Sequence, residues 1–199
     1  MKVFGIGLNK TGTTTLGKCF EQLGLTHTGC SRELLEDFRV RGDLRATFEV
    51  ADRFDSFEDW PWPLLYRQLD QRYPGSKFVL TLRRDPQTWL KSLKEMSLRT
   101  RPLHHCRKLA YGYDYPHGRE QEHLQFYERH RREVLDYFRD RPQDLLVLCW
   151  EDGAGWPELC AFLGRPVPAV PVPHANRGEF AVVPWRRRAA NAILRRLRD

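Results

Sequence analysis

The sequence GLNKTGTTTL, residues 7–16, directly follows a short apolar run and opens a segment of helical periodicity. Gly7 and Gly12 are separated like the two glycines of the common nucleotide-binding loop G-x-x-x-x-G-K-S/T. Thr13, however, occupies the position of that motif's lysine, and Lys10 lies inside the loop. Glycines let a backbone approach a phosphate closely, and N–H groups at a helix N-terminus bind anions. We therefore predict a phosphate-binding loop that differs from that of a standard ATPase or GTPase. The alternative is a tight turn capped by threonine side chains.

The rest of the chain alternates apolar, strand-like runs with segments of helical periodicity. Strands are expected within 2–7, 54–58, 77–83 and 145–150. Helices are expected over 13–24, 31–41, 63–72 and about 119–139, from the Asp85-Pro86 pair onward, and in WPELCAFLG. Strands separated by helices pair in parallel through right-handed crossovers. The sequence thus predicts a three-layer α/β fold of P-loop type, a parallel sheet flanked by helices. We expect a single domain over 1–199, in which 181–199 form a basic C-terminal helix.

Three polar motifs follow predicted strands: the loop after residue 7, DWP at 59–61, and RRDP at 83–86. In open parallel sheets, ligands bind outside the carboxyl ends of the strands. Because all three motifs fall at such ends, we expect them to meet in one site. No apolar strand ends cleanly in the aspartate that helps nucleotide hydrolases to hold Mg²⁺, since Asp152 comes late after its strand. A metal-dependent nucleotide hydrolase is therefore not expected.

The positive charge of the chain is concentrated near its C-terminus. The formal net charge is +7, and residues 181–199 contain six arginines and one aspartate. The remaining residues carry a net charge of only about +2, so we expect no nucleic-acid partner. The basic segment could lie on an anionic membrane surface, or it could form a terminal helix that packs on the domain.

Cysteine and histidine usage predicts neither a disulfide framework nor a metal site. The five cysteines are scattered without a C-x-x-C pair, and the adjacent His104 and His105 have no partners at metal-ligand spacing. The chain begins without the long apolar region of a secretory signal, and no stretch is long enough to span a bilayer. We therefore expect a cytoplasmic protein in a reducing compartment.

NKTGTTTL resembles the 5′-phosphosulfate-binding loop of sulfotransferases that use 3′-phosphoadenosine 5′-phosphosulfate (PAPS), in which lysine precedes the threonine-rich core. Their second motif is an arginine at a strand end with a serine eight residues on, and Arg84 and Ser92 have this spacing. Asn176-Arg177-Gly178 resembles a late loop of the family that contacts the 3′-phosphate. The likeness extends over nearly the whole chain and is strongest to the compact bacterial-type branch. One departure is Thr15, where many cytosolic members have tryptophan.

The resemblance implies sulfuryl transfer from PAPS to a hydroxyl or amine of a small-molecule, glycan or lipid acceptor, with release of adenosine 3′,5′-bisphosphate. It implies that no metal is needed and that Lys10 assists catalysis at the bridging oxygen. The residues implied in PAPS binding are Lys10, Thr11, Gly12, Thr13, Thr14, Thr15, Arg84, Ser92, Arg177 and Gly178.

For the general base we expect Asp59, since the Trp60-Pro61 turn after it would hold its carboxylate at the edge of the sheet. Glu58, Asp55, His104 and His105 are the other candidates. The acceptor site is expected in the aromatic-rich and histidine-rich excursion over 97–118. Two other functions stay open on the same scaffold: a small-molecule kinase, and a nucleotide-binding module without turnover. The sequence does not decide the oligomeric state.

Overall fold

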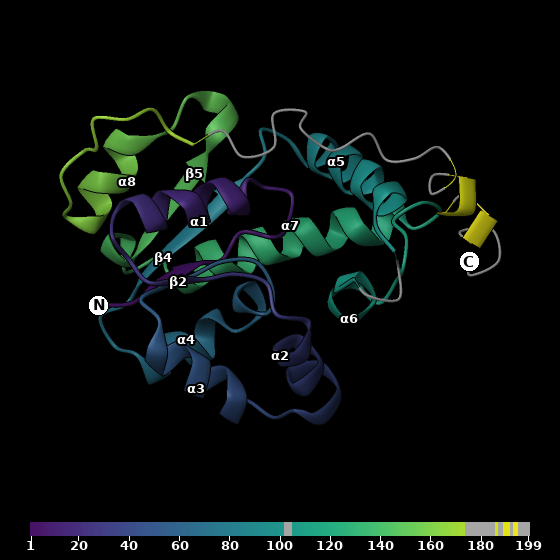
Figure 1. Ribbon diagram of the computed structural model, residues 1–199, viewed down its shortest axis with the longest axis horizontal. Coiled ribbons are helices and arrows are strands. Elements are labelled where there is room, and N and C mark those ends of the chain that lie inside the picture. Colours follow the sequence, from purple (N-terminus) through teal and green to yellow (C-terminus); the bar gives the residue numbers. More distant parts are fainter. Residues whose placement is uncertain (102–104, 174–185, 187–188, 192, 195–199) are drawn as a thin grey trace.

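The computed structural model describes residues 1–101, 105–173, 186, 189–191 and 193–194. Within these residues, five parallel strands form one sheet in the order β2-β3-β1-β4-β5 (Figure 1). The strands are β1 (Val3–Gly5), β2 (His27–Thr28), β3 (Ser56–Phe57), β4 (Lys77–Leu82) and β5 (Leu145–Cys149). Because β1 is the middle strand, the loop that follows it opens at the centre of the sheet's carboxyl edge.

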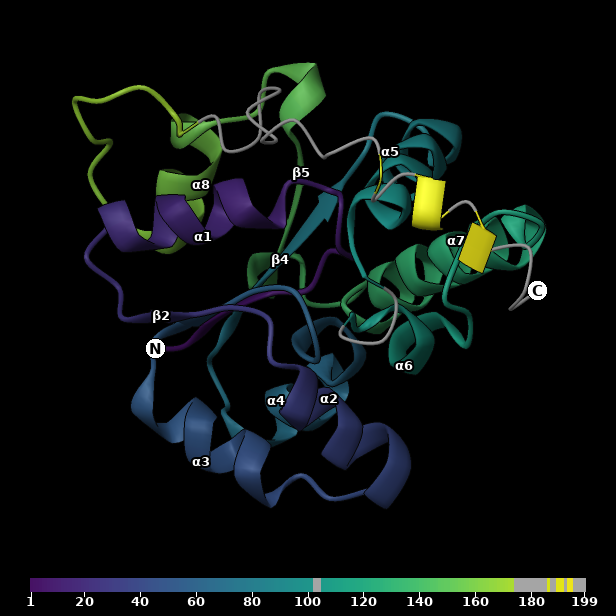
Figure 2. The same ribbon diagram turned by 45° about the vertical axis from the view of Figure 1, so that its right-hand side comes forward.

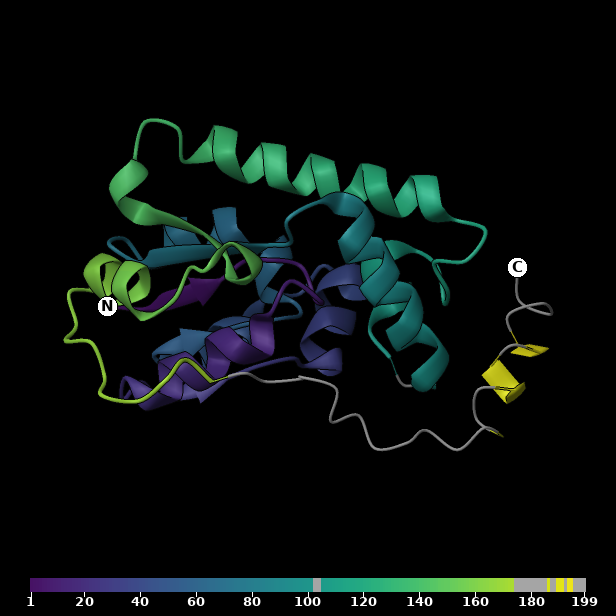
Figure 3. The ribbon, with the colours of Figure 1, turned by 90° about the horizontal axis from the view of Figure 1, so that it is seen from above.

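Helices cover both faces of the sheet, and alternating side chains of β1 and β4 supply a core to each face. Val3 and Val79 lie in a cluster with residues of α1 (Thr13–Gln22) and α8 (Trp156–Leu163). Phe4 and Phe78 belong to the opposite cluster, which includes residues of α3 (Arg45–Arg53), α4 (Tyr66–Arg72) and α7 (Glu120–Tyr137). Figure 3 shows α7 on one side of the sheet and α1 on the other.

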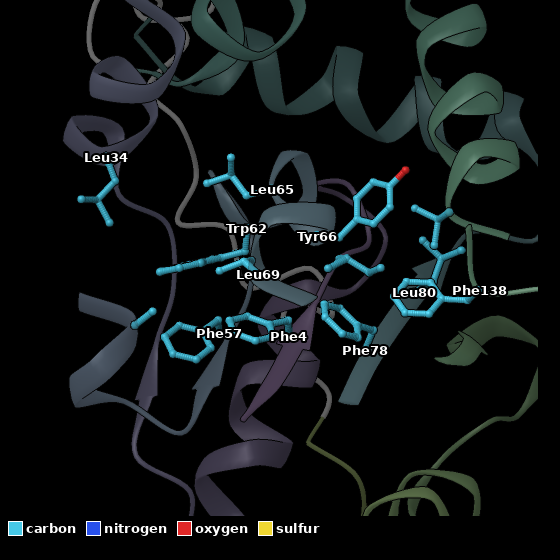
Figure 4. Close-up of a cluster of buried hydrophobic side chains, with 13 residues drawn as sticks. Phe4, Leu34, Phe57, Trp62, Leu65, Tyr66, Leu69, Phe78, Leu80 and Phe138 are labelled. Atoms are coloured by element: carbon cyan, nitrogen blue, oxygen red, sulfur yellow. The ribbon is translucent and has the colours of Figure 1, made fainter. Parts of the chain in front are cut away.

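A row of stacked aromatic rings crosses three neighbouring strands in the second of these clusters (Figure 4). Phe4 is in register with Phe57 of β3 and with Phe78 of β4. Its ring centroid lies 4.6 Å from that of Phe57 and 5.5 Å from that of Phe78, with the rings stacked in both pairs. All three side chains are fully buried, and each such burial stabilises the fold by about 1.5–3 kcal/mol. The row fixes the register of the strands that carry the site.

A third cluster lies beyond the carboxyl ends of the strands. It joins residues of α2 (Arg32–Glu36), α5 (Pro86–Arg99), α6 (Arg107–Tyr111) and α7. Tyr111 is central to it, with its ring 5.4 Å from the Trp60 ring and 6.1 Å from the Trp89 ring. Figure 2 shows α5, α6 and α7 gathered at this end of the molecule. This cluster builds the wall that faces the loop after β1.

The predicted three-layer fold with a parallel sheet in a single domain is confirmed, and the differences are local. Residues 31–41 form α2 and a π-helical turn, η1 (Asp37–Arg41), while 63–72 fall in a 3-10 turn, η2 (Trp62–Leu64), and α4. β2, α3 and α6 are present although the sequence analysis did not predict them. The remaining short elements are the 3-10 turns η4 (Pro142–Asp144) and η5 (Trp150–Asp152).

The predicted C-terminal helix at 181–199 lies mostly outside the described residues. One of its described residues, Asn191, is buried against the end of α5. Its side-chain amide donates to the carbonyls of Leu98 (2.8 Å) and Thr100 (3.2 Å), while its Oδ1 accepts from the Tyr115 hydroxyl (3.3 Å). These contacts dock this part of the chain on the domain.

Candidate functional site

The loop between β1 and α1 packs tightly against β4. A Cβ added to Gly7 would lie 2.0 Å from the Thr81 hydroxyl oxygen and 2.5 Å from the Thr81 carbonyl oxygen, so only glycine fits there. The Thr11 hydroxyl donates to the Leu8 carbonyl at 2.6 Å and lies 2.6 Å from the Thr81 hydroxyl. Thr11 therefore braces the loop through its side chain, and its direct contact with a ligand stays a prediction.

Two large side chains hold Asn9 in the same loop. The Trp89 indole N–H donates to the Asn9 carbonyl at 2.9 Å, and the Tyr111 hydroxyl donates to Asn9 Oδ1 at 2.5 Å. The next residue, Lys10, has a φ of 72°, and Gly12 has a φ of 95°. A lysine rarely adopts the left-handed region, because the Cβ crowds the following carbonyl. The loop is thus held in an unfavourable backbone conformation by contacts from α5 and α6.

A cavity of ≈ 830 Å³ opens beside this loop at the carboxyl edge of the sheet. Of the residues predicted to form the site, those that line it are Lys10, Gly12, Thr13, Thr14, Asp59 and Ser92. Arg99, Thr100 and His105, from the excursion predicted to bind the acceptor, line it as well. Thr15 is buried in α1 and does not line it. The structure therefore brings the loop, the residue after β3 and the helix after β4 into one site.

Asp59 enters this cavity from the turn that follows β3. Its φ is 62°, so it too adopts the left-handed region, and its Oδ1 accepts a hydrogen bond from the Trp60 N–H at 2.8 Å. Burial raises the pKa of Asp59, while the hydrogen bond from Trp60 and the positive charge of Lys10 oppose the rise. A carboxylate with a raised pKa is a better proton acceptor, which suits a general base.

Glu58, the residue before it, occupies a space that three glycines leave free. A Cβ added to Gly29 would lie 2.8 Å from Glu58 Oε1, and one added to Gly5 or Gly17 would come within 3.2 or 3.3 Å of the Glu58 side chain. Burial and the neighbouring charge of Asp59 raise the pKa of Glu58, and a hydrogen bond with Thr13 opposes the rise. Glu58 therefore packs against the start of α1 and does not line the cavity.

Burial lowers the pKa values of two basic side chains that line the cavity, Lys10 and His105. Burial lowers the pKa of Lys10, and the nearby charge of Arg83 adds to this effect, while Asp59 opposes it. Burial also lowers the pKa of His105 to about 4, so this imidazole is neutral at physiological pH.

The other two candidates for the general base, Asp55 and His104, are not among the described residues that line the cavity. Asp55 lies before β3, where its carboxylate accepts from the Thr26 N–H and hydroxyl. His104 lies outside the described residues.

A family model described as the sulfotransferase domain matches residues 2–181. The chain belongs to the sulfotransferase domain family. A curated relative, the Ava biosynthesis cluster protein M of Aspergillus versicolor, is 29% identical over an alignment 213 positions long, which covers 87% of this chain and 80% of that protein. The match with the family model spans every strand and helix from β1 to α8.

In this sulfotransferase domain, the predicted 3′-phosphate pair is split between the cavity and the surface. Ser92 lines the cavity from α5. Arg84 does not line it, because its guanidinium pairs with Asp152 at 3.0 Å and donates to the Glu151 carbonyl at 2.7 Å. Its neighbour Arg83 lines the cavity instead. Arg177 and Gly178 lie outside the described residues. The binding role of all four residues stays a prediction.

The sequence analysis missed Trp150, which follows β5 and contacts Gly12 in the loop after β1. A Cβ added to Gly12 would lie 2.4 Å from Trp150 Cδ1 and 2.6 Å from its Nε1. Nε1 is buried without a hydrogen-bond partner among the described residues. The sequence shows only a tryptophan after an apolar strand, and its contact with residue 12 depends on the tertiary fold. Gly12 is therefore required twice, for its positive φ and for the indole above it.

Within the described ranges, no group of three or more histidine, cysteine, aspartate or glutamate side chains is arranged to hold a metal ion. None of the helices in the described part of the sulfotransferase domain combines the length and the apolar character that a membrane span needs.

Proposed function

We propose that this protein transfers a sulfuryl group from PAPS to an acceptor hydroxyl or amine and releases adenosine 3′,5′-bisphosphate. The observation that carries the proposal is that Lys10, from the loop after β1, and Asp59, from the turn after β3, line the same cavity. A cationic donor and a half-buried carboxylate are thus available in one cavity. The matched family supports sulfuryl transfer as the reaction.

On the donor side, the N-terminus of α1 and the loop before it fit a 5′-phosphosulfate. Thr13 and Thr14, the first residues of the helix, line the cavity, so their N–H groups and the Thr14 hydroxyl are available to an anion. Gly12, which precedes them, lines the cavity as well. PAPS bound in this way would place its bridging oxygen near Lys10.

The transfer needs a proton acceptor on one side and stabilisation of charge on the other. The acceptor oxygen attacks the sulfur and forms the new S–O bond, while the bond from sulfur to the bridging oxygen breaks. Asp59 takes the proton of the acceptor hydroxyl. The electron pair of the broken bond stays on the phosphate oxygen, where Lys10 donates a hydrogen bond to the developing negative charge.

Binding of the 3′-phosphate by Arg84 would require this side chain to exchange partners. The Arg84 and Asp152 side chains are 64% and 58% exposed, and an ion pair this exposed contributes only about 0–1 kcal/mol. A phosphate offers two negative charges and more acceptor oxygens than a carboxylate, so the exchange favours the ligand. Ser92 would then meet the same phosphate from the cavity side.

The substitution Asp59→Asn tests the base directly. Asparagine keeps an oxygen to accept from the Trp60 N–H but cannot take a proton. We expect sulfate transfer over a panel of phenol, sugar and amine acceptors to fall by a factor of about 10²–10⁴, the usual contribution of a general base. The affinity for adenosine 3′,5′-bisphosphate, measured by calorimetry, should change little. Asp55→Asn, at the other end of the same strand, is the matched control, and we expect it to leave transfer unchanged.

Calorimetry with adenosine 3′,5′-bisphosphate and with ATP plus Mg²⁺ distinguishes the proposal from its alternatives. Binding of ATP without binding of the bisphosphate would indicate a kinase and overturn the proposal. Binding of the bisphosphate without transfer to any acceptor would indicate a nucleotide-binding module. Unchanged turnover in Asp59→Asn would remove Asp59 from the role of base.

The five cysteines are free thiols, which supports the further proposal of a reducing, cytoplasmic location.

A further inference from the structure

Two cysteines far apart in the sequence meet at the cavity. Cys30 lies in the loop between β2 and α2, and Cys106 directly precedes α6. Their Sγ atoms are 3.4 Å apart, although 76 residues separate them in the chain. Both residues line the cavity that holds Lys10 and Asp59. Cys30 is exposed and Cys106 is buried, so one thiol is open to solvent and the other faces the cavity only.

The two thiols are chemically different because they share a hydrogen bond. The hydrogen bond between the two sulfur atoms lowers the pKa of Cys106 and raises that of Cys30. The charges of Arg32 and Arg107 also favour the Cys106 thiolate, while burial and Asp59 oppose it. The thiolate is the form of cysteine that attacks peroxides and disulfides. Cys106 is thus the nucleophile of the pair, and Cys30 is placed to resolve the product.

We propose that Cys30 and Cys106 form a site of reversible oxidative modification, which a hydroperoxide converts into a disulfide across one wall of the cavity. The Cys106 thiolate attacks the peroxide oxygen, the O–O bond breaks, and a sulfenic acid and an alcohol (water, for hydrogen peroxide) are formed. The Cys30 thiol then attacks the sulfenic sulfur, the S–S bond forms and water leaves. Two thiols and one hydroperoxide thus give one disulfide, one alcohol and one water.

The disulfide would connect the loop before α2 to the start of α6, beside Asp59. His105 precedes Cys106 and Trp60 follows Asp59 on the same cavity wall, so a fixed link here changes the shape of that wall. Its effect on turnover rests on the proposed function, in which this wall receives the acceptor. In that case oxidation lowers sulfate transfer, and a dithiol reductant restores it. Formation of the disulfide itself depends only on the two thiols.

The decisive experiment measures thiols and mass, and needs neither PAPS nor an acceptor. The full chain is treated with one equivalent of hydrogen peroxide, its free thiols are alkylated, and its intact mass and peptides are recorded. We expect the loss of two hydrogen atoms, two fewer alkylated cysteines, and a cross-linked peptide that contains Cys30 and Cys106. Cys149→Ser, at the end of β5, should behave like the wild type. Cys30→Ser should instead gain oxygen at Cys106, because no resolving thiol remains.

Phenylarsine oxide provides a second measurement on the unmodified protein, since trivalent arsenic binds two thiols that lie side by side. We expect one arsenical per chain in the wild type and in Cys149→Ser, and none in Cys30→Ser or Cys106→Ser. Peptide mapping of the wild-type adduct serves if a cysteine variant does not fold. An unchanged mass after peroxide, a disulfide between other cysteines such as the buried Cys19 and Cys160, or a stable sulfenic acid at Cys106 in the wild type would overturn the proposal. Loss of two hydrogens in a chain that, in its reduced form before peroxide, transfers no sulfate would leave the proposal intact and reject the proposed function.

Discussion

The substitution Gly12→Ala tests whether the conformation of the loop after β1 depends on the indole of Trp150. Gly12 has a φ of 95°, a conformation that costs an alanine about 1–2 kcal/mol. The new methyl group would also lie 2.4 Å from Trp150 Cδ1, whereas ordinary contacts begin near 3.4 Å. The indole must therefore move by about 1 Å, and overpacking of this kind costs about 1–3 kcal/mol. We expect Gly12→Ala to lower the free energy of unfolding by about 2–5 kcal/mol in total.

Gly75→Ala is the matched control for this measurement. Gly75 precedes β4 at the opposite edge of the sheet, has a φ of 78°, and has no atom within 4 Å of an added Cβ. Gly75→Ala should therefore lower the free energy of unfolding only by the cost of the backbone conformation, about 1–2 kcal/mol. A double-mutant cycle isolates the cost of the clash between the methyl group and the indole. It compares the wild type with Gly12→Ala, Trp150→Ala and the double variant. We expect the double variant to be more stable than the sum of the two single effects by about 1–3 kcal/mol. Urea denaturation gives all four free energies.

Binding provides the functional readout of the same perturbation. A displaced indole and a strained residue at the start of α1 shift the N–H groups that would hold the 5′-phosphate. Calorimetry with adenosine 3′,5′-bisphosphate should show a loss of affinity of tenfold or more, about 1.4 kcal/mol or more, for Gly12→Ala and no change for Gly75→Ala. Equal destabilisation by the two alanines, or a coupling near zero in the cycle, would refute the reasoning.

Three further predictions concern the base of the loop, the 3′-phosphate and the contact that holds Asn9. Because the pKa of Glu58 is raised in the fold, the free energy of unfolding should fall as pH rises above the ordinary carboxyl pKa. Urea denaturation at about pH 5 and about pH 9 measures this fall, which should be smaller in Glu58→Gln than in the wild type. Arg84→Ala and Ser92→Ala should each weaken bisphosphate binding about tenfold or more in calorimetry, since a hydrogen bond to a charged group contributes about 1.5–3 kcal/mol; unchanged affinity would place the 3′-phosphate elsewhere. Tyr111→Phe leaves the buried Asn9 oxygen without its donor and should lower the free energy of unfolding by about 1–3 kcal/mol, and an unaltered stability would show that this bond contributes nothing.

The features that the sequence predicted are those that depend on neighbours in the chain. Residues 77–82 are rich in apolar side chains, which indicates a buried strand. The Asp85-Pro86 pair marks the start of α5, where the Asp85 carboxylate accepts from the Thr88 N–H. β2 has two residues, too few for any periodicity, and it is a strand only because β3 pairs with it. α3 buries Thr47 and Ala51 and packs the partly buried Phe48 against the core, a helical pattern that the sequence analysis overlooked.

The candidate site also contains some residues that the sequence predicted and others that only the tertiary fold brings together. Lys10, the threonines of the loop and Asp59 follow strands directly, so the rule for parallel sheets predicts that they lie at one edge. Contacts across the fold are invisible in the sequence: Trp150 above Gly12, the three glycines around Glu58, and the meeting of Cys30 with Cys106. Nothing in the sequence alone shows that Arg83, and not Arg84, faces the cavity, because this depends on the direction in which β4 ends.

The positive φ of Lys10 and Asp59 has a consequence for engineering. Glycine at either position would relieve about 1–2 kcal/mol of backbone strain, and it would remove the two side chains on which the proposed chemistry depends. A library selected only for heat resistance should therefore drift toward glycine at 10 and 59 and yield robust, inactive variants. Thermostabilisation of this scaffold has to hold both positions constant and seek its gains far from the carboxyl edge of the sheet.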